Sequence, residues 1–130
     1  MEDRRVLVDT SILIDFFRKK NKKETALFKI QQNHEIYAST ITEFEFLAGV
    51  KDDSVLSLKH FFSKINLLTF DSNAAKKASS IYQELKSKNK IIEFRDIFIA
   101  ATALAHNLPI STLNKEHFRR IEGLKILGGT

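Results

Sequence analysis

The sequence predicts an α/β protein in which a mainly parallel central sheet of four to five strands is flanked by helices. Short apolar runs alternate along the chain with longer segments of helical periodicity, as in successive strand–helix–strand units. The 130 residues include only one proline and four glycines, which leaves little room for a linker, and no repeat is visible. A chain of this length is expected to form one domain, residues 1–130.

The first third of the chain predicts two strands separated by two helices. Val6-Leu7-Val8 is short, apolar and β-branched, which is typical of a buried strand. Thr10 or Ser11 is expected to cap the helix that follows. The expected elements are a strand at 5–8, helices near 11–18 and 24–32 separated by a basic loop at 18–23, and a strand at 35–40.

The rest of the chain continues the alternation. The segment 93–107 is apolar nearly all round, so this helix is expected to be buried, ending at Asn107 and Pro109. The expected elements are helices near 42–50 and 53–63, a strand at 66–70, a helix at 72–90 capped by Ser72, the helix at 93–107, a strand at 108–113 and a possible fifth strand at 124–127.

Composition excludes several classes of protein. There is no cysteine, which excludes disulfides and thiolate metal sites and fits a cytoplasmic location. No apolar run approaches the ~18 residues of a membrane span, and the acidic start at Glu2 and Asp3 is unlike a signal peptide. The net charge of +5 favours a polyanionic partner.

One carboxylate lies between two apolar runs at the end of the first predicted strand. An unpaired buried carboxylate is costly, so Asp9 is expected at the edge where the strand ends and the next helix begins. Ligands bind at this edge in open α/β sheets. The alternative is a plain cap or turn aspartate.

Two further segments carry acids at comparable places. Asp96 leads into the apolar helix, with Glu93 one turn earlier, and helix-dipole stabilisation is the alternative explanation for both. Glu43 and Glu45 lie early in the helix at 42–50, where Thr42 and Glu45 also match a capping box.

These acids suggest a metal site. The carboxyl ends of parallel strands share one edge, and carboxylates that converge there repel one another unless a cation joins them. Oxygen ligands without thiolates suit Mg²⁺ or Mn²⁺. A histidine-bound zinc site is not expected, because the four histidines show no HxxH pattern, and His117 is interpreted as a packing or surface residue.

Four segments resemble the PIN-domain ribonucleases, specifically the VapC-type toxins of toxin–antitoxin pairs. They read VLVDTSILIDFF, YASTITEFEFLAGV, EFRDIFIAATALAHNLPISTLNKEHF and RIEGLKIL, and they occur in the order and at the separations of that family. Together they cover nearly the whole chain. The resemblance implies a PIN-like three-layer fold and hydrolysis of RNA by an acidic site that binds Mg²⁺ or Mn²⁺.

The resemblance also assigns roles to residues. It implies Asp9, Glu45 and Asp96 as catalytic and metal-binding acids, with Glu43 as the alternative to Glu45. The fourth position falls on Asn114, where many members have Asp, which weakens a second metal site. The supporting residues it implies are Thr10, Ser11 and Thr112, with Glu93 as an outer acid.

Partners follow from the same comparison. RNA is the implied substrate, cut to leave a 5′-phosphate and a 3′-hydroxyl, and a homodimer inhibited by a cognate antitoxin is the implied assembly. One phenylalanine of each adjacent pair is a candidate for the dimer or antitoxin surface. Candidate RNA-binding residues are Arg18, Lys19, Lys20, Lys22 and Lys23, with Arg95, Arg119 and Arg120 as further candidates.

Two other functions stay open at this point. A PIN domain with a weakened acid cluster acts as a scaffold that binds RNA or protein without cutting. An RNA-processing nuclease of the same fold is the second alternative. The acids Asp9, Glu45 and Asp96 favour an enzyme, and the compact length favours a toxin.

Overall fold

A computed structural model describes residues 3–128, and it contains the predicted parallel sheet. Four strands lie in the order β3-β2-β1-β4, and every neighbouring pair is parallel. Leu7 at the centre pairs with Tyr37 on one side and with Ile110 on the other. The strands are β1 (Arg5–Val8), β2 (Glu35–Ser39), β3 (Asn66–Leu68) and β4 (Ile110–Ser111).

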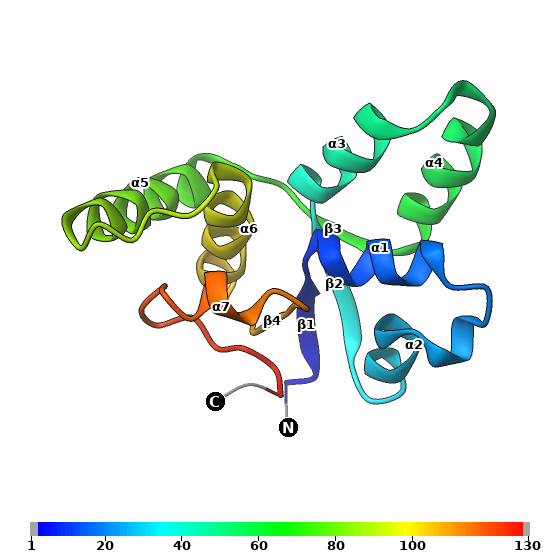
Figure 1. The fold of residues 1–130 in the computed structure, drawn as a ribbon, viewed down its shortest axis with the longest axis horizontal. Helices are drawn as coiled ribbons and strands as arrows, with labels where there is room; N and C mark the ends of the chain where they lie inside the picture. The colour runs from blue at the N-terminus through cyan, green and yellow to red at the C-terminus, as the bar shows by residue number, and fades with distance from the viewer. Residues whose placement is uncertain (1–2, 129–130) are drawn as a thin grey trace.

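Helices cover both faces of the sheet (Figure 1). Helices α1 to α4 lie on one side of the strands and α5 to α7 on the other, so the three-layer α/β prediction is confirmed. No helix within residues 3–128 is long and apolar enough to cross a membrane. The helices are α1 (Thr10–Arg18), α2 (Ala26–Gln31), α3 (Thr40–Gly49), α4 (Val55–Lys64), α5 (Ser72–Ser87), α6 (Phe94–Ala105) and α7 (Lys115–Phe118), with 3₁₀ turns at Lys22–Glu24 and Asp52–Ser54.

The two faces of β1 enter two separate cores. Leu7 packs with α5, α6 and the segment after β4, whereas Val8 packs with α1, α2 and α4. Consecutive residues of a strand point to opposite faces, so one short strand serves both layers. Helix α6 is buried along most of its length, as its composition predicts. This packing holds the strand ends rigidly at the edge where the acids lie.

Three predicted caps are wrong by one or more residues. Asp9, and not Thr10 or Ser11, caps α1, and Asp71, and not Ser72, caps α5. Ser39 caps α3, which starts at Thr40, so the capping box at Thr42 does not form. In each case the observed cap residue precedes the predicted one and has an extended backbone. Its side-chain oxygen accepts an N–H of the first helical turn, so the helix begins earlier than predicted.

The end of the chain differs from the prediction. Residues 124–127 form no fifth strand; Ile126 makes a single parallel bridge to Ile110. Gly123 and Gly128 flank this segment, and both have positive φ angles, which glycine adopts without strain. The short helix α7, between β4 and this segment, was not predicted, and Asn107, also with positive φ, follows the end of α6 as expected.

Candidate active site

The acids lie at the point where the order of the strands in the sheet reverses, between β1 and β4. Successive strands β1, β2 and β3 run outward in one direction, whereas β4 pairs with the other side of β1. The ends of β1 and β4 therefore meet at a topological switch point, where open α/β sheets bind ligands. A helix that leads into a parallel strand runs opposite to it, so α6 begins at this same edge.

Asp9 is the buried centre of this edge. Its side chain caps α1 by accepting the Ile12 N–H on Oδ1 at 3.3 Å. Ser11 Oγ donates to the same oxygen at 2.5 Å, and Thr112 Oγ1 donates to Oδ2 at 2.5 Å. The cap explanation is thus correct but incomplete, because two hydroxyls hold the carboxylate in addition to the helix N–H.

The environment of Asp9 disfavours its charge. Burial raises the pKa of this carboxyl, and the negative charge of Asp96 raises it further. The hydrogen bonds from Ser11, Thr112 and Ile12 act in the opposite direction but do not cancel the effect of burial. A carboxyl group that is buried away from water and has a raised pKa is typical of a functional site.

Glu45 lies on α3 and is held at both oxygens. Thr10 Oγ1 donates to Oε1 at 2.8 Å, and Arg95 Nη1 donates to Oε2 at 3.1 Å. The buried Thr42 hydroxyl lies 3.1 Å from Thr10 Oγ1, and it donates there because the Thr10 proton is used on Glu45. Glu43, the alternative acid, forms no hydrogen bond or ion pair within the described part of the chain.

Asp96 lies in the first turn of α6, and its partner is a histidine. His117 Nδ1 lies 3.1 Å from Asp96 Oδ2. The interpretation of His117 as a packing or surface residue therefore missed a contact with a site acid. A signal for it was present, since His117 lies only six residues after the end of β4, and β4 ends at this edge.

Glu93 and Asn114 lie further out. The Glu93 carboxylate is exposed and pairs with Arg95 Nε at 2.9 Å. The Asn114 N–H donates to Thr112 Oγ1 at 2.9 Å, so its backbone supports the threonine that holds Asp9. Asn114 lines a groove of about 390 Å³ beside α1, together with Ser11, Ile14, Asp15, Arg18, Lys19 and Leu113.

The basic segment at 18–23 is only partly available to a ligand. Lys19 pairs with Asp15 at 2.9 Å, and Lys22 donates to the carbonyls of Phe16 and Lys19 at 2.5 and 2.9 Å. Lys20 and Lys23 are exposed, and Arg18 is exposed at the end of α1. Of the two basic residues that line the groove beside α1, Lys19 is paired with Asp15, so Arg18 is the one available to a ligand.

The predicted acids are neighbours, but they do not form a ready metal cage. No group of three Asp, Glu, His or Cys side chains within residues 3–128 is close enough together to hold a metal ion. Each acid is turned instead toward a partner from the chain itself. The donor chemistry nevertheless fits Mg²⁺ or Mn²⁺, since the site offers carboxylate oxygens and a buried Asp9 whose charge lacks a cation.

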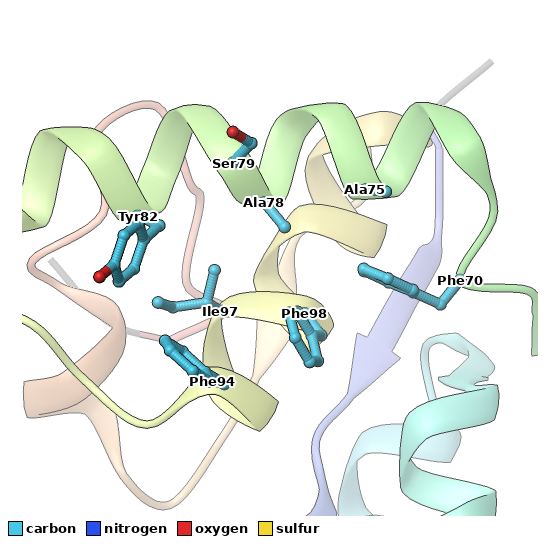
Figure 2. Close-up of a pocket in the computed structure, with 8 residues that line it drawn as sticks. All are labelled: Phe70, Ala75, Ala78, Ser79, Tyr82, Phe94, Ile97 and Phe98. Carbon is cyan, nitrogen blue, oxygen red and sulfur yellow. The ribbon is translucent and has the colours of Figure 1, made fainter.

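An apolar pocket of about 300 Å³ lies between α5 and α6 (Figure 2). Tyr82, Phe94, Ile97 and Phe98 surround it, and Phe70 closes one end. It contains no acid or base, so it contributes nothing to the chemistry of the site. Phe94 and Ile97 nevertheless flank the helical turn that carries Asp96.

Known proteins share both sequence and fold with this chain. Residues 6–124 match the PIN domain family. Ribonuclease VapC1 of Methanocaldococcus jannaschii is 34% identical over 128 residues, which cover 96% of this chain and 88% of that protein. DNA-bound VapBC from Salmonella typhimurium contains a similar chain, with a TM-score of 0.82, 25% identity and coverage of 94% and 96%.

A toxin–antitoxin complex from Klebsiella pneumoniae contains another similar chain, with a TM-score of 0.70, 26% identity and coverage of 92% of this chain and 94% of that one. The family match spans nearly the whole sequence, and the relatives match over comparable lengths. This chain belongs to the PIN-domain family, among its VapC-type members.

Proposed function

We propose that this protein, a single PIN domain, is a Mg²⁺- or Mn²⁺-dependent endoribonuclease and the toxin of a type II toxin–antitoxin pair. The observation that carries the proposal is the buried Asp9, held by hydroxyls from both sides of the switch point and electrostatically coupled to Asp96. Kinship with a protein named ribonuclease VapC1 supports the reaction class. We place its action in the cytoplasm, where RNA and a newly made antitoxin are both present.

The acids would hold the cation and the hydroxyls would orient the acids. Asp9 and Asp96 are the expected ligands, joined by Glu45. A bound divalent cation lowers the pKa of water and neutralises charge on the phosphate. Ser11 and Thr112 keep both oxygens of Asp9 in place, and Thr10 does the same for one oxygen of Glu45. Cleavage is expected to leave a 5′-phosphate and a 3′-hydroxyl.

The groove beside α1 is the proposed path of the RNA backbone. It begins at Ser11, which contacts Asp9, and it leads to Arg18 and to the Asp15–Lys19 ion pair, whose lysine an RNA phosphate would take from Asp15. Asn114 faces this groove and offers a neutral amide to the RNA or to the edge of the site. Positive side chains along such a groove attract phosphates without reading sequence.

The proposed antitoxin site is a second groove, of about 430 Å³, between α1, α3 and α4. Phe17, Phe46, Val50 and Leu58 make it apolar, and Glu45 lies at its edge. An antitoxin segment with apolar side chains for the groove and a basic residue for Glu45 fits this chemistry. The similar chain in a toxin–antitoxin complex supports such a partner.

A homodimer is proposed through the exposed phenylalanines beside the site. Phe44 and Phe94 are 68% and 58% exposed. Each directly precedes one member of the Glu45–Arg95 ion pair, so the two phenylalanines lie on helices, α3 and α6, that meet at the site. We infer that a second copy of this chain covers these phenylalanines. Because they adjoin the site, such a dimer would bring the two active sites close together along one bound RNA.

Cleavage of a structured RNA pool tests the proposal. The wild type is compared with Asp96→Asn, with Asp53→Asn as an exposed acid control on the 3₁₀ turn at 52–54, each with Mg²⁺, Mn²⁺ or EDTA. We expect cutting that needs the metal, survives in the control and disappears in Asp96→Asn. Cutting that persists in Asp96→Asn would overturn the assignment of the site.

The scaffold function is the second candidate. The observation that favours it is the pairing of Glu45 and Asp96 with Arg95 and His117, which leaves no three-acid group among the described residues. RNA binding without cleavage by a folded wild type, with every metal tried, would support the scaffold and exclude the nuclease.

A further inference from the structure

Arg95 has an unusual place for an exposed arginine. Its side chain is 57% exposed, yet two of its nitrogens are held by different carboxylates. Nη1 binds Oε2 of Glu45 at 3.1 Å, and Nε binds Oε2 of Glu93 at 2.9 Å. Glu45 belongs to the site and is only 16% exposed, whereas the Glu93 carboxylate is 60% exposed and lies outside it.

The contact with Glu45 blocks a ligand position. Thr10 donates to Oε1 of Glu45, and Arg95 donates to Oε2, so the guanidinium occupies the oxygen that no hydroxyl holds. A divalent cation and a guanidinium at one carboxylate oxygen repel each other, and the repulsion is strong in a partly buried site where the local dielectric constant is low. Metal binding at Oε2 of Glu45 therefore competes with the contact from Arg95.

Arg95 can release Glu45 and still remain beside the acids. It precedes Asp96 in the first turn of α6, and its contact with Glu93 keeps the guanidinium at the edge of the acid group. A guanidinium binds phosphate oxygens through paired, charge-assisted hydrogen bonds. Arg95 is thus placed to bind an RNA phosphate that approaches the acids.

We propose that Arg95 is a substrate-binding residue with two positions. Without RNA it neutralises Glu45; when RNA and metal bind, it moves to a phosphate next to the scissile bond and releases Glu45 to the metal. This inference rests on the proposed nuclease function. Metal and RNA then bind cooperatively, since each favours the position of Arg95 that the other needs.

Direct measurement of Mn²⁺ binding tests the proposal without relying on cleavage. Titration by electron paramagnetic resonance compares wild type with Arg95→Gln, first without RNA and then with a short non-cleavable RNA analogue. Arg5→Gln is the matched control, because Arg5 is also a solvent-accessible arginine paired with a carboxylate, Asp3, and it lies at the start of β1, the opposite end of that strand from Asp9.

We expect Arg95→Gln to bind Mn²⁺ roughly fivefold more tightly than wild type in the absence of RNA, and to lose most of the mutual enhancement by RNA. The KM for RNA cleavage rises several-fold in the same variant. Arg5→Gln leaves all three quantities unchanged. Weaker or unchanged Mn²⁺ binding by Arg95→Gln would show that Arg95 only supports Glu45 or is idle, and would overturn the proposal.

Failure of the nuclease function is distinguishable from failure of this inference. Asp9→Asn and Asp96→Asn are titrated with Mn²⁺ in parallel. If both bind Mn²⁺ as the wild type does, the metal site itself is wrong, and the role of Arg95 falls with it. If both lose Mn²⁺ while Arg95→Gln gains nothing, only the role of Arg95 is wrong.

Discussion

Thr112 donates its hydroxyl proton to Oδ2 of Asp9 across 2.5 Å and thereby joins two buried residues that are 103 positions apart. The bond connects the end of β4 to the end of β1 at the switch point of the sheet. The Thr112 hydroxyl also accepts the Asn114 N–H, so it is a link between the loop after β4 and the site.

Replacing Thr112 by Val should destabilise the fold and loosen the site. The change keeps the shape but leaves a buried Asp9 oxygen and the Asn114 N–H without a partner, a cost of about 1–3 kcal/mol in the free energy of unfolding. Urea denaturation measures it. Thr102→Val is the control, because Thr102 is buried but donates only to the Phe98 carbonyl within α6. Equal losses in both variants would contradict a special role for Thr112.

Asp9→Asn should change how stability depends on pH. The folded-state pKa of Asp9 lies above its ordinary value of 3.8, so between these two pKa values the folded protein holds a proton that the unfolded chain has released. The contribution of Asp9 to the free energy of unfolding is therefore fully present below pH 3.8 and is lost as pH rises through the raised pKa. Its size is about 1.4 kcal/mol for each unit by which the folded-state pKa exceeds the unfolded-state pKa.

Urea denaturation in EDTA from pH 3.5 to 7.5 measures this effect. The stability of Asp9→Asn relative to wild type should increase with pH, whatever constant offset the altered hydrogen bonds introduce. Asp53→Asn, an exposed acid, is the control for the procedure. A relative stability of Asp9→Asn that falls with rising pH would show that hydrogen bonding outweighs burial at Asp9.

Glu45→Gln and Glu43→Gln should separate the two candidates for the second acid. Glu45 is held by Thr10 and Arg95 at the site, whereas Glu43 has no such partner among the described residues. We expect cleavage to fall by about a hundredfold or more in Glu45→Gln and to change little in Glu43→Gln. Single-turnover cleavage rates are the measurement, and the reverse order would transfer the role to Glu43.

Phe94→Ser should weaken the dimer. A phenylalanine buried in both copies contributes about 1.5–3 kcal/mol on each side, so the dissociation constant should rise by about tenfold or more. Sedimentation equilibrium measures it. Leu56→Ser is the control, because Leu56 is 80% exposed on α4 and outside the proposed interface. A dimer lost in Leu56→Ser but kept in Phe94→Ser would place the interface on α4.

The layered fold was predictable because its signals are local. Val6-Leu7-Val8 and the apolar 93–107 segment show their burial in their own composition, and their order along the chain implies a parallel sheet. Helix starts were less predictable. At 9–11, Asp, Thr and Ser are all good caps, and the choice of Asp9 depends on which side chain reaches the Ile12 N–H.

The sequence by itself determined that this protein is a PIN-type α/β domain with Asp9, Glu45 and Asp96 at one end of its parallel sheet, because hydrophobic periodicity and motif order are properties of the chain. The tertiary structure decided what each acid touches: Thr112 at Asp9, Arg95 at Glu45 and His117 at Asp96. These partners lie 21 to 103 positions from their acids. Hydrogen bonds act over about 3 Å, so only the packing of β4, α6 and α7 around the sheet selects them.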